Sequence, residues 1–338
     1  MLEPHEALRS WQQVSSGSPR PAPDAGLINR TYLVGDPPTA VLQWVNPIFD
    51  ASIHHDIAAL TEHLAASGLD TPKLLPTREG ALSLDDSEGS WRLLSYVPGR
   101  TVHRLDGPEL AFEAGRLVGR FHAAVADWDH RFVAPRRNIH DTPARMAELE
   151  SALDAAENHP LADDVRRIGD EILTAWRAWD GSLDQPERPC HGDLKISNLR
   201  FDADGRGLCL IDLDTIGPMS IAAEMGDAWR SWCNPVPEDQ PDSASFDLDR
   251  FRASARGWLS TAPPLTDSER IALVPAIERI ALELAARFAA DALRNSYFWE
   301  DRERFSQPGQ HNLMRCRGQL AFARSAHAQR SQAEEAMR

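Results

Sequence analysis

One segment in the second half of the chain combines acidic, basic and amide side chains that can act together on a phosphate group. It reads HGDLKISN (191–198) and is followed by apolar and turn-forming residues that end at Asp212. Turn residues centred near Gly205 predict a β-hairpin in which Asn198 lies across from Asp212. An amide oxygen and a carboxylate placed together suit a hard cation such as Mg²⁺. Asp193 lies in the loop that enters the hairpin, within reach of that cation.

An aspartate ahead of an Asn–Asp metal pair is the arrangement that phosphoryl transfer requires. Asp193 would accept the proton of the acceptor hydroxyl, and Mg²⁺ would bridge the β- and γ-phosphates of ATP. Lys195 would place a compact positive charge on the γ-phosphate. The competing interpretation is a structural turn, with Asn198 and Asp212 capping the ends of a hairpin. Each residue alone is compatible with that interpretation, whereas the joint pattern favours the chemical one.

The positive charges of the chain are unusual in type. Among 338 residues, Lys and Arg total 36 and Asp and Glu total 51, which gives a formal net charge of −15. Only Lys73 and Lys195 are lysines. A chain this acidic is a poor partner for nucleic acid or for an anionic membrane surface. Since Lys73 is expected in a solvated loop, Lys195 is the lysine available for phosphate.

The chain lacks several sequence patterns that are typical of membrane, secreted and metal-binding proteins. No run approaches the length of a membrane span, and the N-terminus lacks the pattern of a signal peptide. The four cysteines show no CxxC spacing, so we expect free thiols in a reducing compartment. These features predict a soluble cytoplasmic protein that acts on a small molecule, and they leave its oligomeric state open.

The hydrophobic pattern divides the chain into a β-rich part and a helical part. Residues 1–97 are expected to form an N-lobe with an antiparallel sheet and one main helix, and residues 98–338 a helical C-lobe that carries the hairpin. The predicted fold is therefore α+β and bilobal. Expected strands are 27–34, 40–45, 74–76, 81–84 and 91–96, expected helices are 1–13, 53–67, 108–127, 142–157, 162–179, 247–259, 267–295 and 312–328, and the last ten residues are expected to fray.

HGDLKISN followed by LIDLD (210–214) resembles the catalytic and metal segments of the aminoglycoside phosphotransferase and choline kinase superfamily, which has a protein-kinase-like fold. The resemblance implies that Asp193 is the catalytic base and that Asn198 and Asp212 hold Mg²⁺. Other segments are similar to the bacterial N-acetylhexosamine 1-kinases, which implies ATP-dependent phosphorylation of the anomeric hydroxyl of N-acetylglucosamine or N-acetylgalactosamine. These segments are GLINRTY (26–32), VLQ (41–43), HDTPAR (140–145), IDLDT (211–215), GDAWR (226–230), 283–288 and HNL (311–313) with Arg315.

The expected nucleotide site departs from the usual kinase pattern. Gln43 stands where kinases place a phosphate-binding lysine, as the resemblance to hexosamine kinases also implies. The loop at Asn29 and Arg30 is not a GxGxxG, although its backbone amides could cover the phosphates and Arg30 could add charge. The hinge residues Tyr96 and Val97 would offer backbone groups to adenine. Glu224-Met225 replaces the Asp-Phe pair typical of the branch, which leaves the geometry of that loop open.

Residues after the hairpin are candidates for the substrate wall. Asp227 and Arg230 either steady that wall or form a structural ion pair. Arg287 either reaches sugar hydroxyls, as the resemblance implies, or belongs to a charged ladder on a helix surface. Trp232, with other aromatic residues, either stacks on a sugar or packs in the core. Asp214 is a second metal ligand or, preferably, a residue that supports the ligands.

Two alternative functions remain compatible with the sequence. The first is a kinase of another small alcohol, such as an aminoglycoside, choline, another hexose or glucosamine. The second is an inactive kinase fold that binds a nucleotide, which the missing N-lobe lysine favours. The presence of Asp193, Lys195, Asn198 and Asp212 argues against inactivity.

Overall fold

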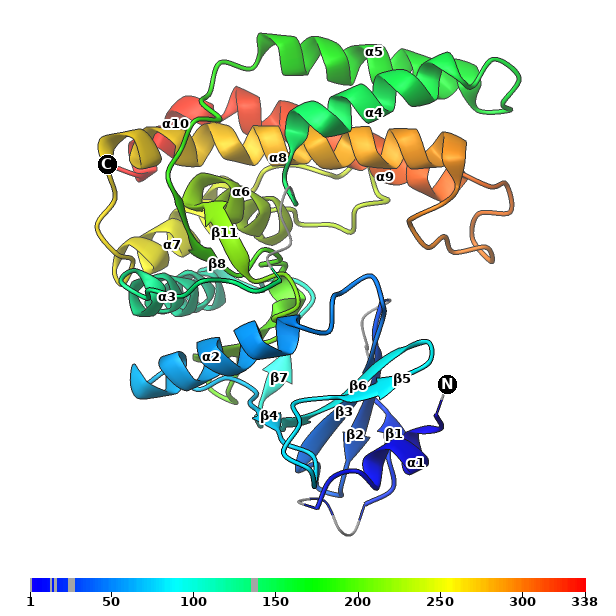
Figure 1. The fold of residues 1–338 in the computed structure, drawn as a ribbon. Helices are drawn as coiled ribbons and strands as arrows, with labels where there is room; N and C mark the ends of the chain where they lie inside the picture. The colour runs from blue at the N-terminus through cyan, green and yellow to red at the C-terminus, as the bar shows by residue number, and fades with distance from the viewer. Residues whose placement is uncertain (1, 13, 15–16, 24–27, 135–138) are drawn as a thin grey trace.

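The computed structural model describes residues 2–12, 14, 17–23, 28–134 and 139–338. A β-rich N-terminal part precedes a mainly helical C-terminal part (Figure 1), which confirms the predicted α+β fold. The division between the two at residues 97 and 98 stays a prediction.

The N-terminal part is an antiparallel six-stranded sheet in the order β1-β2-β3-β6-β4, with β5 paired to β6. Alternate residues of β3 are buried, and Leu42, Trp91 and Leu93 form a core with Trp11. Helix α2 packs on β4 and α3 and so connects the sheet to the helical part. The elements are α1 (Pro4–Leu8), β1 (Arg20–Pro21), β2 (Arg30–Val34), β3 (Ala40–Val45), α2 (Ile53–Ala66), β4 (Leu74–Leu75), β5 (Leu84–Asp86) and β6 (Gly89–Ser95).

The C-terminal part is organised around the long helix α8 (Asp267–Arg294). Helices α4 and α5 cover one side of α8 and α6 lies on the opposite side (Figure 1), while α9 packs along it. The remaining helices are α3 (Pro108–Val125), α4 (Thr142–Asp154), α5 (Ala162–Ala178), α6 (Ile221–Trp232), α7 (Leu248–Leu259), α9 (Gln310–Ala328) and α10 (Arg330–Ala336).

Two small sheets carry the predicted catalytic segment. One has the order β10-β9-β7, from β7 (Arg100–Thr101), β9 (Leu199–Phe201) and β10 (Gly207–Leu210), and the other pairs β8 (Glu187–Cys190) with β11 (Gly217–Ser220). The predicted hairpin register is wrong by one residue, since Leu199 pairs with Leu210 and the backbone of Asn198 bonds Ile211. The turn is centred one residue earlier than predicted, since Asp202 bonds Arg206 and Phe201 pairs with Gly207. A bulge between Gly207 and Cys209 then reduces the resulting two-residue error in register to one.

Some element boundaries also differ from prediction. Among the described residues of the expected first helix, only Pro4–Leu8 are helical, and β5 starts where the expected strand 81–84 ends. Residues 24–27, which include the expected start of the 27–34 strand, lie outside the described residues. The C-terminal residues expected to fray form α10, because Ala333 and Met337 are buried there. Among the described residues, no helix is both long and apolar enough to cross a membrane.

Helices α3 and α7 approach so closely that only glycine fits at the contact. A Cβ atom at Gly115 would lie 1.9 Å from the carbonyl oxygen of Ser254, and one at Gly257 would lie 2.0 Å from that of Phe112. Because α3 also packs on β10, this contact supports the hairpin.

We expect Gly115→Ala to lower the free energy of unfolding by roughly 1–3 kcal/mol, because the two helices must move apart. Urea unfolding followed by circular dichroism measures the loss. Ala123→Ser, on the exposed face of α3, is the control and should stay within about 0.5 kcal/mol of the wild type. Equal losses in both variants would contradict the packing argument.

Candidate active site

Four polar side chains from the catalytic segment and the hairpin end meet at one place. The Lys195 ammonium donates to Asp193 and lies 3.7 Å from Asp212 Oδ2. Asn198 Nδ2 donates to the Asp193 carbonyl at 2.8 Å and to its Oδ2 at 3.1 Å. A 3₁₀ turn over Ile196–Asn198 folds the chain back and makes these contacts possible. The structure thus brings together the four residues that the sequence predicted as neighbours.

The charges at this site shift the pKa values of two of its members. Loss of water around Asp212 and the nearby charge of Asp214 raise the pKa of the Asp212 carboxyl. Desolvation opposes charge on Lys195, but the carboxylates of Asp193 and Asp212 outweigh it and raise its pKa. Lys195 therefore keeps its proton and its positive charge. The closely spaced carboxylates of Asp193 and Asp212 also favour a further positive charge beside them.

The loop carrying Asp193 is held in place by hydrogen bonds between side chains and backbone groups. His191 donates through Nε2 to the Ile211 carbonyl at 2.9 Å, so its Nδ1 accepts from the backbone N–H of Asp193 at 3.3 Å. Thr215 Oγ1 donates to the His191 carbonyl at 2.8 Å. Gly192 has φ of 84°, and a Cβ atom there would lie 2.4 Å from the Thr215 carbonyl oxygen, so glycine is required. These bonds join the loop to the segment containing Asp212.

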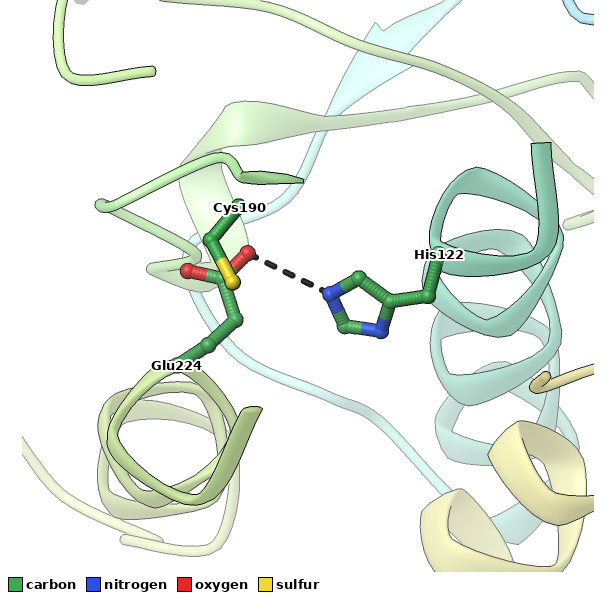
Figure 2. Close-up of side chains that lie close together, drawn as sticks. All are labelled: His122, Cys190 and Glu224. Atoms are coloured by element: carbon green, nitrogen blue, oxygen red, sulfur yellow. Dashed lines mark hydrogen bonds and ion pairs between the residues drawn. The ribbon is translucent and has the colours of Figure 1, made fainter. Parts of the chain in front are cut away.

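Glu224 on α6 is the buried anchor of this loop. Its Oε1 accepts from the backbone N–H of His191 at 2.7 Å, and its Oε2 from that of Gly192 at 2.8 Å. Figure 2 shows the carboxylate facing His122 and Cys190, with the bond to His122 Nε2 at 3.3 Å. Glu224 therefore satisfies two buried backbone donors beside Asp193. The sequence left this loop geometry open, and the structure resolves it.

The arrangement in Figure 2 brings possible metal ligands within 4.8 Å of one another, but their bonding fits an anchor better. Trp258 donates to His122 Nδ1 at 3.0 Å, which places the His122 proton on Nε2, toward Glu224. Cys190 bonds the Met219 carbonyl, and burial raises the pKa of its thiol well above the usual value. A protonated imidazole nitrogen and a neutral thiol are poor metal ligands.

The predicted nucleotide residues Gln43 and Asn29 are engaged within the protein. Gln43 Oε1 accepts two bonds from Arg92, and its Nε2 donates to Thr31. Asn29 Nδ2 donates to Asp214 at 2.6 Å, and its Oδ1 accepts from the backbone of Asn46. Their side chains therefore connect the sheet to the hairpin end.

The other predicted nucleotide residues lie at the edges of the N-terminal part. Arg30 is exposed, with its guanidinium 5.1 Å from the centre of the Trp44 ring. The backbone N–H of Tyr96 donates to the Thr39 carbonyl at 3.2 Å, so it is already used within the sheet. Val97 is half-buried directly after it.

The predicted substrate residues on α6 have different surroundings. Arg230 donates to Asp227 at 2.8 and 3.1 Å and to Glu238 at 3.1 Å, which forms a buried charged cluster. Placing Trp232 among substrate contacts was wrong. Its side chain is 1% exposed and its Nε1 donates to the Leu194 carbonyl at 2.8 Å, because α6 packs directly under the catalytic loop.

Arg287 on α8 belongs to an aromatic cluster. Its guanidinium lies 5.5 Å from the ring centre of Tyr297 and 5.3 Å from that of Phe298. Tyr297 and Trp299 are both 57% exposed on the segment between α8 and α9, which extends toward the N-terminal part in Figure 1. Asp291 accepts backbone bonds from this segment and a side-chain bond from Asn312.

Sequence reasoning missed Arg92 and the contact between His140 and Glu283. Glu283 accepts from Thr142 at 2.6 Å and bonds His140 Nδ1 at 3.0 Å. Burial opposes protonation of His140, but Glu283 outweighs it and raises the pKa of the imidazole. A signal existed for the Glu283 contact, since HDTPAR and 283–288 were both singled out as motifs. Arg92 carried no comparable signal.

The β-rich and helical parts, the anchored Asp193 loop and the hairpin carboxylate define a protein-kinase-like phosphotransferase. The phosphotransferase enzyme family matches residues 21–264, more than half of the chain. The chain therefore belongs to that family, and its reaction is phosphoryl transfer to a small alcohol.

Individual relatives are distant. The homoserine kinase of Xanthobacter autotrophicus is 26% identical over 267 residues, which are 78% of this chain and 76% of the relative. The homoserine kinase of Zymomonas mobilis is 25% identical, with 79% of each chain covered. In structure, an amicoumacin kinase bound to AMP-PNP and Ca²⁺ matches with a TM-score of 0.63 at 15% identity, covering 94% and 91% of the two chains. An aminoglycoside phosphotransferase from Alicyclobacillus acidocaldarius matches with 0.62 at 16%, covering 98% and 97%.

We expect Glu224→Ala to lower both stability and turnover, since it leaves two buried backbone N–H groups unpaired at roughly 1–3 kcal/mol each. Urea unfolding and ADP release measure the two effects. Glu224→Asp, which keeps both oxygens on a shorter side chain, is the matched control and should retain more of each property. Wild-type turnover in Glu224→Ala would contradict the anchoring role.

Proposed function

We propose that this chain uses ATP and Mg²⁺ to phosphorylate the anomeric hydroxyl of an N-acetylhexosamine such as N-acetylglucosamine or N-acetylgalactosamine. The observation that carries the ATP-dependent reaction is the joint placement of Asp193, Lys195, Asn198 and Asp212 on an anchored loop. The family assignment supports the same chemistry.

The protein's part in the reaction is positioning and charge. The Asp193 carboxylate, with about a third of its side chain exposed, accepts the hydroxyl proton as the hydroxyl oxygen bonds the γ-phosphorus and the bond to ADP breaks. Lys195 stabilises the charge on the transferred group. Asn198 and Asp212 fit Mg²⁺, because Asn198 uses its Nδ2 on Asp193 and keeps its oxygen for a ligand. Bound Mg²⁺ would neutralise phosphate charge.

The proposed acceptor rests on segments that lie together in space. HDTPAR, 283–288 and the HNL segment resemble the hexosamine kinases. The first two meet through Glu283, while Asn312 and Arg315 of the third contact Asp291 and Phe288 of α8. Exposed Tyr297 beside Arg287, and exposed Trp299 on the same segment, offer the aromatic surface on which sugar rings stack. These contacts support a sugar acceptor.

Homoserine is a second candidate acceptor, because homoserine kinases recur among the relatives. A group of buried hydrogen-bond donors is compatible with homoserine as the acceptor. Arg279 has two guanidinium nitrogens, and His140 its Nε2, with no hydrogen-bond partner among the described residues. Both lie near Glu283, and such donors would suit a carboxylate.

We expect ADP release with N-acetylglucosamine or N-acetylgalactosamine to exceed release with homoserine, choline, aminoglycosides, glucosamine and plain hexoses. Chelation of Mg²⁺ by EDTA should abolish the reaction and added Mg²⁺ should restore it. Phosphorus NMR of the product would show an anomeric phosphate. Faster ADP release with homoserine than with the sugars would contradict the sugar assignment but would agree with the kinase mechanism. No ADP release with any acceptor of the panel would contradict the kinase activity itself.

We expect Asp193→Ala to reduce kcat by about 100-fold or more, the usual contribution of a positioned general base. Calorimetric affinity for Mg²⁺ and AMP-PNP should change little, because Asp193 faces the acceptor. Asp204→Ala, in the exposed turn of the hairpin, serves as a control and should leave both quantities unchanged. Full turnover in Asp193→Ala would rule out the proposed base.

A further inference from the structure

A buried ion pair joins the N-terminal sheet to the segment that contains the proposed metal ligand. Arg92 lies on β6 and Asp214 lies two residues beyond Asp212, and both side chains are 2% exposed. The guanidinium makes a two-point contact, with Nη1 on Oδ1 and Nη2 on Oδ2, the latter at 2.9 Å. Two-point contacts of this kind fix geometry as well as charge.

Gln43 orients the Arg92 side chain toward Asp214 at the hairpin end. The two residues are directly paired between β3 and β6, and Gln43 Oε1 accepts from Arg92 Nε at 2.9 Å and from Nη2 at 2.8 Å. Gln43 is itself fixed by its bond to Thr31 Oγ1 at 3.0 Å. A lysine at position 43 would put a second cation against the guanidinium. The residue types at these two positions therefore depend on each other.

Asp214 is fully engaged by the N-terminal part. Besides Arg92, its Oδ2 accepts from Asn29 Nδ2 at 2.6 Å, and Asn29 is held by the backbone of Asn46. His54 of α2 faces the same pair, and burial, followed by the charge of Arg92, lowers its pKa to about 4. Neutral His54 leaves Arg92 as the cation for Asp214. The Asp214 carboxylate is thus turned to the sheet, while Asp212 stays partly exposed.

We propose that Arg92 is the positioning cation of the N-terminal sheet: by binding Asp214 it holds the Asp212 segment in the geometry that receives Mg²⁺ and nucleotide. The inference rests on the proposed ATP-dependent function and extends it to a residue outside the catalytic segment. Arg92 acts through Asp214, since its guanidinium is buried and its bonds go to Gln43 and Asp214. It supplies the charge that Gln43 cannot.

A double-variant cycle tests this inference with AMP-PNP and Mg²⁺, so that the acceptor plays no part. Arg92→Gln, Asp214→Asn and the double variant are compared with the wild type by calorimetry, and circular dichroism checks folding. Each single change should weaken binding by about tenfold, because charge-assisted hydrogen bonds are lost. The double variant should also lose about tenfold in affinity, since both changes break one contact. Arg20→Gln, on exposed β1 of the same sheet, should stay within about twofold.

Arg92→Lys keeps the charge without the two-point contact and covers the case in which Arg92→Gln does not fold. Its affinity for AMP-PNP and Mg²⁺ should fall between those of the wild type and Asp214→Asn. Wild-type affinity in Arg92→Gln or Arg92→Lys would overturn the inference, and so would a loss near 100-fold in the double variant, which would mean independent roles. If the wild type itself binds no AMP-PNP with Mg²⁺, the proposed function fails together with the inference.

Discussion

Mutual repulsion among carboxylates is the constraint that organises this molecule. Asp214 and Asp193 lie close enough to Asp212 to add to the effect of burial and raise the pKa of its carboxyl, in a chain of net charge −15. Two cations, Lys195 and Arg92, offset this repulsion. Lys195 bonds Asp193 and lies near Asp212, while Asp214 is paired with Arg92 and Asn29. Asp193 and Asp212 are both partly exposed, but Asp193 is bonded by Lys195 and Asn198. Asp212 is therefore the carboxylate furthest from neutralisation, and a divalent cation beside it lowers the energy most.

The backbone around these charges has to be rigid, because a carboxylate that moves by an ångström no longer matches its partner. Glu224 supplies that rigidity from α6 by accepting the amides of His191 and Gly192, and its own position is fixed by His122, which is fixed in turn by Trp258. Trp258 lies on α7, whose close contact with α3 depends on glycine. A chain of buried contacts thus runs from helix packing to the loop of Asp193.

The part of the site that sequence reasoning could predict is the part that is local in the chain. The catalytic segment and the hairpin span few residues, so their neighbours follow from turn chemistry, although the turn lies one residue earlier than predicted and a bulge only partly corrects the register. Arg92 and Asp214 are 122 residues apart and meet only after β3 pairs with β6, which single-sequence patterns do not specify. Trp232 was misassigned for a related reason: which face of α6 lies under the loop depends on tertiary packing.

The proposed acceptor contacts come from residues other than those of this charge arrangement. The proposed transfer step needs one hydroxyl beside Asp193, and the residues proposed to hold the acceptor lie on α4, α8 and the segment after α8. Here that region combines a buried His140–Glu283 contact with the exposed Tyr297 ring beside Arg287. A neutral sugar would use this ring and leave the buried charges paired, whereas an amino acid would have to pair with charged donors. The proposal of a sugar acceptor therefore depends on the balance between aromatic surface and buried charge in this region, and the catalytic residues do not distinguish the two acceptors.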